Sequence, residues 1–482
     1  MLAPWVMNEM KTVELNDKRL NERLQVVLSQ LAEHPTASIP AACGGHAEMT
    51  AAYRLFDNEK ATFDKILDAH ADATQKRIAA QPVVVLVQDT TEIDVTRPMQ
   101  PMVGAGPLDS GARVGALLHL LHAFTPDGTP LGTTHALAWT REEASPCSGL
   151  SHSQRAAIPI EEKESYRWVA ALNQAQSVAQ QSPETQCICV ADSEADIYEF
   201  FSAGTAHGTS VDWVVRAAQN RALRSENEVA GCLREHLLGQ DVLFTQTVKV
   251  RGRDALVTCE TRGRRQPRES REAEVEVRAG RVTLRPPWRR GNKLPEVTVH
   301  AVLVHEPNPP SDDVAVEWLL VTTLPIEDAD EVRRVIEVYC VRWMIEVFFR
   351  VLKSGCRVEQ RRFEHIDRLL TALAVYLIVA WRTLFVCRLG QSCPDIPCEA
   401  VFEPAEWKAV WKVVRREDPP PSAPSLGTMV RMVAQLGGYV NRKRPDWPGP
   451  QTIWLGLQRM HDFALCWQMF GPETRERQLE LV

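Results

Sequence analysis

The chain has 482 residues, of which 44% are hydrophobic and 24% charged, and these are the proportions of an ordinary globular protein with room for about two to four domains. Its formal net charge of −7 argues against a nucleic-acid binder, although a local basic face can bind phosphate on an acidic protein. The 12 cysteines include no C-x-x-C pair, which argues against a structural zinc site and fits a reducing cytosol.

The first part of the chain is predicted to be helical. A helix capped by Asp17 is expected to bury an apolar stripe made of Leu15, Leu24, Val27, Leu28 and Leu31. The basic residues Lys18, Arg19 and Arg23 lie off that stripe and are expected to face solvent. One further helix is expected around 49–56 and another from about Phe63 to Ala79. The first twenty residues lack a long apolar stretch, so no secretory signal is expected.

Strand patterns follow, and two of them lead directly to aspartates. The β-branched run at 83–88 ends at Asp89, and the run CICVA at 187–191 ends at Asp192. Between them, two apolar runs flank a turn at 126–128, and a helix is predicted from about Glu162 to Gln180. With a further strand at 211–215, this order predicts a mixed α/β layer architecture.

The hydrophobic period then switches to two, which predicts a β-rich insertion at about 238–322. Its loops are rich in arginine, and a solvated hairpin tip and a DNA-facing surface are equally good interpretations of that charge. From 330 to about 388 the chain is expected to be helical. The apolar run at 369–384 is interrupted by Arg382 and is interpreted as a buried core helix and not as a membrane span. The last ninety residues are expected to form a small helical domain.

One helical segment carries a group of polar residues on a single face. Tyr339, Arg342, Glu346, Arg350 and Lys353 fall within roughly 80° of arc at about 100° per residue. Arginine offers a bidentate fork to phosphate, lysine a point charge, and a tyrosine hydroxyl can also donate to phosphate. The alternative is a salt-bridged surface helix.

Asp89, Asp192 and Glu346 are the candidate metal ligands and catalytic residues. Hard divalent cations take oxygen ligands, and two such ions can drive an in-line displacement at phosphorus. In the alternative interpretation, the aspartates merely end strands and the glutamate pairs with a neighbouring arginine. The chain contains no G-x-x-x-x-G-K-[ST] phosphate loop and no G-x-S-x-G nucleophile elbow.

These motifs resemble those of the bacterial cut-and-paste DDE transposases of the insertion-sequence-four family, Tn-five type. The helix pattern Y-x2-R-x3-E-x6-K is that family's signature, and Asp89-Thr90-Thr91 corresponds to its DTT. The stretch beginning at Asp192 corresponds to its D-R-E-A-D-I, with Ser193 in place of the arginine. Arg350 stands where Tn-five-type proteins have lysine. Further matches lie at 162–165 before Trp168, at 214–216, at Trp318, at 436–438 and at 443–444.

The resemblance implies a ribonuclease-H-like catalytic core at 76–389 containing the β-rich insertion, flanked by a helical DNA-binding domain at 1–75 and a helical dimerisation domain at 390–482. It implies DNA cleavage at transposon ends, hairpin formation and opening, and strand transfer into target DNA. Two Mg²⁺ ions, or Mn²⁺ in their place, would bind Asp89, Asp192 and Glu346. The residues expected to contact DNA are Tyr339, Arg342, Arg350, Lys353, Trp318, Arg216, Lys18, Arg19 and Arg23, with Trp318 stacking on a flipped base.

The expected partners are transposon-end DNA, target DNA and a second copy of the chain in the DNA complex. The expected location is the bacterial cytoplasm at the nucleoid, without membrane contact. Two other functions fit the same motifs. A structure-specific nuclease would cut DNA without joining it, and a non-catalytic or inhibitory relative would bind DNA without cutting it.

Overall fold

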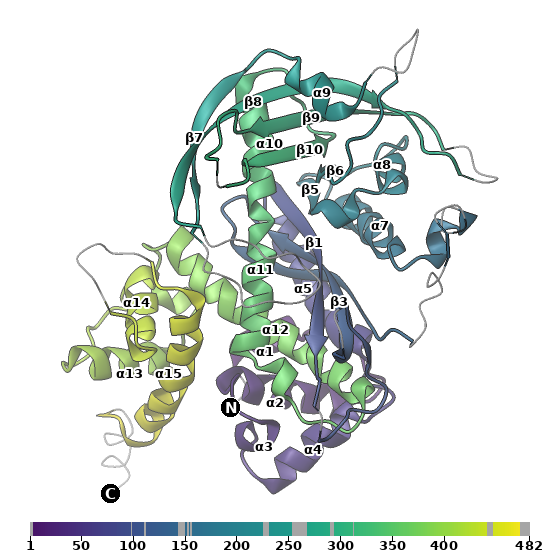
Figure 1. Ribbon diagram of the computed structural model, residues 1–482. Coiled ribbons are helices and arrows are strands. Elements are labelled where there is room, and N and C mark those ends of the chain that lie inside the picture. Colours follow the sequence, from purple (N-terminus) through teal and green to yellow (C-terminus); the bar gives the residue numbers. More distant parts are fainter. Residues whose placement is uncertain are drawn as a thin grey trace, which may run out of the picture.

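A computed structural model gives the fold (Figure 1). It describes residues 3–97, 99–109, 112–142, 150–151, 154, 157–224, 231–252, 268–289, 294–311, 313–440 and 447–472. Much of the arginine-rich insertion loop, including Arg262 and Arg264, lies outside the described residues, as do Lys443 and Arg444.

The described residues form one mixed sheet of ten strands, ordered β2-β3-β1-β5-β6-β10-β9-β8-β7, with β4 paired to β3. Strands β1, β5 and β6 are mutually parallel, while the flanking pairs are antiparallel. The strands are β1 (Val83–Asp94), β2 (Gly106–Pro107), β3 (Val114–Phe124), β4 (Pro130–Trp139), β5 (Gln186–Ala191), β6 (Asp212–Arg216), β7 (Phe244–Val250), β8 (Arg271–Leu284), β9 (Val297–His305) and β10 (Glu317–Thr322).

Helices cover both faces of this sheet, because its central strands are apolar on both sides. Val84 and Leu86 pack on the face covered by α7, whereas Val85 and Val87 pack on the face covered by α10, α11 and α12. The helices of the first face are α7 (Tyr166–Gln181), α8 (Tyr198–Gly204) and α9 (Leu233–Leu238), and those of the second are α10 (Ala329–Val341), α11 (Trp343–Arg350) and α12 (Ile366–Ser392).

The N-terminal helices match the sequence-based expectations. Asp17 caps the helix α2 by accepting a hydrogen bond from the Arg19 backbone N–H, and the predicted apolar stripe is buried. Helix α5 packs against β4 and α12 and begins and ends at the predicted residues. The helices of this region are α1 (Pro4–Glu9), α2 (Lys18–Glu33), α3 (Ile39–Ala42), α4 (His46–Phe56) and α5 (Phe63–Ala79).

One strand prediction needs correction. β1 does not end at Asp89 but continues to Asp94, because the residues after Asp89 pair with β3. The region at about 238–322 is rich in strands, as predicted, and its long strand β8 is continuous from Arg271 to Leu284. Its strands β7 to β10 extend the central sheet beyond β6 (Figure 1).

The region after 330 is helical but interrupted. Helices α10 and α11 run end to end (Figure 1), and the helical backbone of Arg342, with φ −49° and ψ −36°, joins them. A π-helical turn at Val351–Gly355 and a 3-10 turn at Val358–Gln360 then separate α11 from α12. A π-turn adds a residue to the helical repeat, so Lys353 leaves the regular spacing that the sequence predicted.

Helix α12 is a buried core helix, as the sequence predicted. It lies in the apolar core on the face of the sheet that α10 and α11 also cover. It is long and apolar enough to cross a membrane, the only such helix among the described residues, yet 78% of its most apolar window is buried inside the protein. Its C-terminal end joins the helices α13 (Pro404–Arg415), α14 (Leu426–Leu436) and α15 (Pro450–Phe470), which form a separate apolar cluster around it.

Gly456 allows α14 and α15 to pack closely, because a Cβ there would lie 1.9 Å from the Val433 carbonyl oxygen. Gly456→Ala should therefore lower stability by about 1–3 kcal/mol or more, despite the better helix propensity of alanine. Gly449→Ala is the control, since a Cβ at Gly449 meets nothing within 4 Å. Thermal unfolding followed by circular dichroism measures both variants, and equal effects would contradict the packing argument.

Candidate active site

The parallel register of β1 and β5 brings two predicted aspartates to one edge of the sheet. The last parallel pair is Val87 with Val190, and Asp89 and Asp192 each follow two residues later. Side chains two residues apart on a strand point to the same face, so both carboxylates lie on the face of the sheet that α10 and α11 cover. Asp192 lies directly after β5 and caps a short 3-10 turn by accepting from the Glu194 N–H at 2.8 Å.

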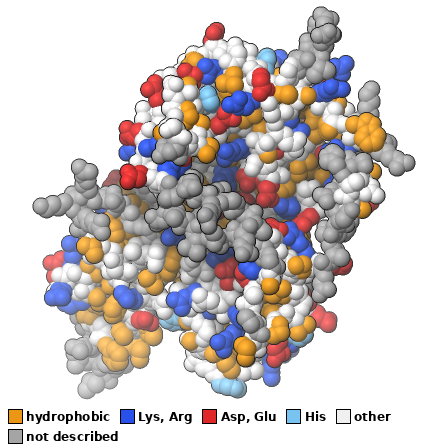
Figure 2. Space-filling view, in the orientation of Figure 1, with side chains coloured by type: hydrophobic (Ala, Val, Ile, Leu, Met, Phe, Trp, Pro, Cys, Tyr) orange, Lys and Arg blue, Asp and Glu red, His pale blue; other side chains and the backbone are white. Residues whose placement is uncertain are grey.

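Arg342 joins the third carboxylate to this edge. Its Nη1 lies 3.1 Å from Asp89 Oδ2 and 3.6 Å from Glu346 Oε1. The Asp89 side chain is 11% exposed and that of Glu346 is 45% exposed, so the group opens to solvent on the α11 side. On the face shown in Figure 2, acidic and basic side chains adjoin one another in the recessed middle of the molecule.

At Asp89, the combined charge of Asp192 and Glu346 outweighs the opposing charge of Arg342. Burial, together with the nearby charges of Asp192 and Glu346, raises the pKa of Asp89 to about 7 against the opposing charge of Arg342. Burial alone would lower the pKa of Arg342, but Tyr339 and the three carboxylates raise it above its ordinary value. The three acids therefore share one electrostatic environment.

This donor set suits a divalent cation. Carboxylate oxygens are the ligands that hard cations prefer, and mutually repelling carboxylates are stabilised by positive charge between them. The described residues nevertheless contain no group of three acidic, histidine or cysteine side chains already arranged as metal ligands. Arg342 lies between Asp89 and Glu346, so the three acids would hold a cation only after a local rearrangement of this side chain.

Tyr339, Trp318 and Arg216 form a second group beside the carboxylates. Tyr339 is 5% exposed, and its ring meets the half-buried Trp318 edge to face at 5.6 Å between centroids. Arg216, at the end of β6, donates from Nη2 to the Glu317 carbonyl oxygen at 3.1 Å. Burial raises the pKa of the Tyr339 hydroxyl, so this group remains a proton donor at neutral pH.

The other predicted DNA contacts are spread more widely. Arg350 is exposed on α11, whereas Lys353 in the π-turn forms an ion pair, with its Nζ 3.6 Å from Glu359 Oε1. Lys18 and Arg19 are exposed on α2 and Arg23 is half-buried. Helix α2 lies at the end of the molecule opposite β7 to β10 (Figure 1), so these three residues do not join the carboxylate group.

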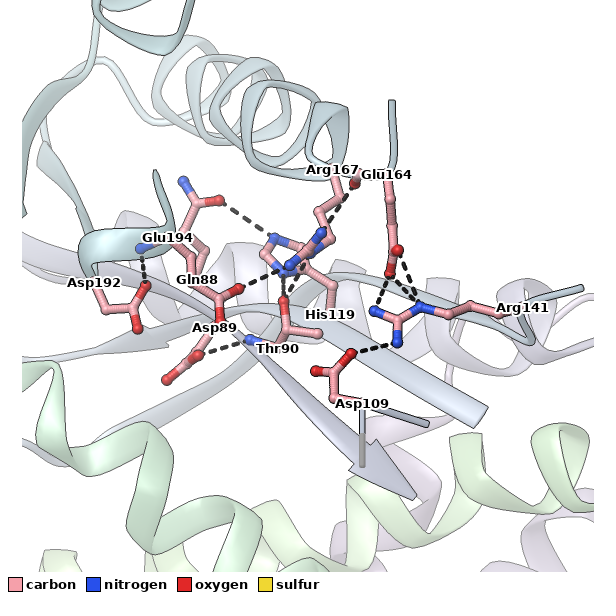
Figure 3. A network of polar contacts seen from close by, with 10 residues as sticks. All are labelled: Gln88, Asp89, Thr90, Asp109, His119, Arg141, Glu164, Arg167, Asp192 and Glu194. Carbon is pink, nitrogen blue, oxygen red and sulfur yellow. Dashed lines mark hydrogen bonds and ion pairs between the residues drawn. The ribbon is translucent and has the colours of Figure 1, made fainter. Parts of the chain in front are cut away.

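Neither His119 nor Arg167 was identified from the sequence as part of this region, and Thr90 was named only within the match to the family's DTT. They form a polar network directly behind Asp89 on the α7 face of the sheet (Figure 3). The sequence signal that could have pointed to Arg167 was the family match at 162–165 before Trp168, which lies next to it in the chain. His119 gave none, because it and His122 stand in a strand that is otherwise apolar.

Comparisons with protein families identify the chain. The family model described as transposase DNA-binding matches residues 3–61, the one described as transposase DDE domain matches 148–381, and the one described as transposase Tn5 dimerisation domain matches 378–468. The DDE match includes Asp192 and Glu346 but begins after Asp89. A solved structure of the piggyBac transposase synaptic complex with hairpin DNA is similar at a TM-score of 0.33 and 8% identity; the match covers 68% of this chain and 52% of that one, so the chain spans about half of its length.

The chain belongs to the Tn5-like DDE transposases. The three models together describe a DNA-binding domain, a DDE domain and a dimerisation domain of transposases. Dependence on a divalent metal is general to the DDE domain.

The raised pKa of Asp89 makes a stability prediction for the metal-free protein. The folded state keeps this proton up to about pH 7, whereas the unfolded chain releases it near its ordinary pKa of 3.8, so Asp89 costs stability as the pH rises between these values. Asp89→Asn should therefore stabilise the fold at pH 8, by up to about 4 kcal/mol, and have little effect at pH 4. Urea unfolding in the presence of a chelator measures the difference.

Asp94, on the same strand, is the matched control. Burial alone would raise its pKa, but hydrogen bonds from Thr96 and Arg113 hold the pKa below its ordinary value. Asp94→Asn should therefore destabilise the protein at pH 8, the opposite sign. A destabilising Asp89→Asn at pH 8 would contradict the electrostatic argument.

Proposed function

We propose that the chain cleaves DNA at transposon ends through a ribonuclease-H-like core and transfers the freed ends into target DNA. The strand order β4-β3-β1-β5-β6, with β3 and β4 antiparallel and β1, β5 and β6 parallel, supports that core. The observation that carries the proposal is that Arg342 contacts both Asp89 and Glu346, while Asp192 lies near enough to raise the pKa of Asp89. The domain division at about 75 and 389 belongs to the same proposal.

In this proposal the three carboxylates hold two Mg²⁺ ions, which Mn²⁺ can replace. Bound there, the metal would activate a water or a 3′ hydroxyl and stabilise the departing oxygen of an in-line displacement. Arg342 would leave Asp89 and Glu346 and neutralise phosphate charge instead, since its fork matches phosphate as well as carboxylate. Its present contacts offset part of the negative charge of the acidic group.

The neighbouring groups would position DNA. Tyr339, Arg216 and Lys353 would donate to phosphates, and Trp318 would stack on a base flipped from the duplex as a hairpin forms and opens. Arg350 would add a phosphate contact on the exposed side of α11. Lys18, Arg19 and Arg23 on α2 would contact DNA farther from the cleaved bond.

Two copies would bridge two transposon ends, each held through the region after 389. The exposed Leu465, Met469 and Phe470 near the end of α15 give that region an apolar surface suited to such a contact. DNA cleavage and strand transfer would take place in the cytoplasm at the bacterial nucleoid.

Asp89→Asn tests the proposal directly. Loss of a metal ligand removes several kcal/mol of transition-state stabilisation, so cleavage should fall by at least about a thousandfold while binding to end DNA stays within about twofold. Asp94→Asn, which changes an aspartate paired with Arg113, should retain cleavage. Comparable losses in both variants would contradict the assignment, and cleavage without strand transfer in the unchanged protein would identify a nuclease.

Trp318→Ala should impair hairpin formation more than the first nick. Stacking contributes about 1–3 kcal/mol per base, so hairpin yield should fall by about 10–100-fold, and Trp318→Phe should restore part of it. Gel analysis of nicked and hairpin products separates the two steps. If Trp318→Ala instead lowers the unfolding temperature and both steps equally, Trp318 is a core residue only.

A further inference from the structure

Arg167 makes three directed contacts from α7 behind the active-site edge (Figure 3). Its Nε donates to Thr90 Oγ1 at 2.9 Å, its Nη2 to Glu194 Oε2 at 2.8 Å and its Nη1 to the Glu164 carbonyl oxygen at 3.0 Å. The side chain is 12% exposed and lies near the rings of Trp139 and Trp168. Every nitrogen of this guanidinium group therefore has a defined partner.

Two of these partners also hold the aspartates. The backbone N–H of Thr90 donates to Asp89 Oδ1 at 2.7 Å, and the backbone N–H of Glu194 donates to Asp192 Oδ1 at 2.8 Å. The single side chain of Arg167 therefore contacts both Thr90 and Glu194, whose backbone N–H groups bind the two carboxylates.

We propose that Arg167 is a positioning residue that sets the spacing and orientation of Asp89 and Asp192 through Thr90 and Glu194. This inference rests on the proposed metal-binding role of the aspartates. Arg167 touches neither carboxylate. Thr90 points to the opposite face of β1 from Asp89, so the effect passes through the backbone.

The hydroxyl of Thr90 is fixed by its other neighbours. Gln88 Nε2 donates to the Cys189 sulfur, which leaves Gln88 Oε1 to accept from His119 Nε2 at 3.3 Å. Burial lowers the pKa of His119 well below its ordinary value, so the ring is neutral and its Nδ1 accepts the Thr90 O–H at 2.9 Å. The Thr90 oxygen then offers its lone pairs to Arg167, and the threonine cannot rotate without breaking two hydrogen bonds.

The geometry of a guanidinium is necessary for this role. Its planar fork reaches Thr90 and Glu194 at once, whereas a lysine ammonium is a single point on a flexible stem. Arg167→Lys should therefore keep the charge and lose the positioning. A purely electrostatic role would survive that change.

The test measures binding of Mn²⁺ alone to the full-length protein, by loss of the free-ion electron paramagnetic resonance signal. Arg167→Met and Arg167→Lys should each weaken Mn²⁺ affinity by about 10–100-fold, as expected when a group that orients metal ligands is removed. Arg141→Met is the matched control, since Arg141 pairs with Glu164 and Asp109 in the same network but contacts neither Thr90 nor Glu194. Wild-type Mn²⁺ affinity in Arg167→Lys, or an equal loss in Arg141→Met, would overturn the proposal.

Thr90 variants supply the second arm. Thr90→Val keeps the shape but removes the hydroxyl and should lose affinity, whereas Thr90→Ser should restore it. Combined with Arg167→Met, Thr90→Val should add little, because Arg167→Met already removes the contact between Arg167 and Thr90. Fully additive losses would overturn the proposal.

Asp89→Asn and Asp192→Asn separate the two levels of argument. If they lose Mn²⁺ affinity while Arg167→Met does not, the positioning role fails and the proposed function stands. If neither aspartate variant loses affinity, the proposed function itself fails. Thermal unfolding of each Arg167 variant, matched to that of Arg141→Met, shows that a loss of affinity is not a loss of fold.

Discussion

The parallel pairing of β1 with β5 is the constraint on which the rest of the site depends. It fixes two aspartates, 103 residues apart in the chain, at the same level of one sheet edge. The apolar runs before them bury against helices on both faces, so a shift in register would cost the core its packing as well as the site its geometry. The register of the central strands therefore fixes where the two aspartates lie.

Electrostatic strain is the second property of this edge. Asp89 is buried, and two further carboxylates lie near enough to raise its pKa. Arg342 compensates part of that charge on the α11 side, and Arg167 orders the backbone on the other side of the sheet. The two arginines differ in kind. Arg342 contacts Asp89 and Glu346 and would exchange them for phosphate in the proposed function, whereas all of the Arg167 nitrogens bond neighbours away from the open side.

Local patterns in the sequence predicted a large part of this fold. An apolar stripe of helical period located α2, a long apolar run located α12, and the two strand runs led to Asp89 and Asp192. The patterns could not show that β1 continues to Asp94, since the extension depends on pairing with β3, nor that a π-turn moves Lys353 out of the helical spacing. The roles of Arg167 and His119 could not be predicted for a related reason. They come from contacts between segments that only the folded sheet brings together.

The most direct measurement of the central claim is the position of bound metal. Crystals of the protein with end DNA, soaked in Mn²⁺ and measured at the manganese absorption edge, would show the ions by anomalous scattering. The account predicts two peaks about 3.5–4 Å apart between Asp89, Asp192 and Glu346, with Arg342 turned toward phosphate. Peaks elsewhere, with Arg342 still between Asp89 and Glu346, would contradict it.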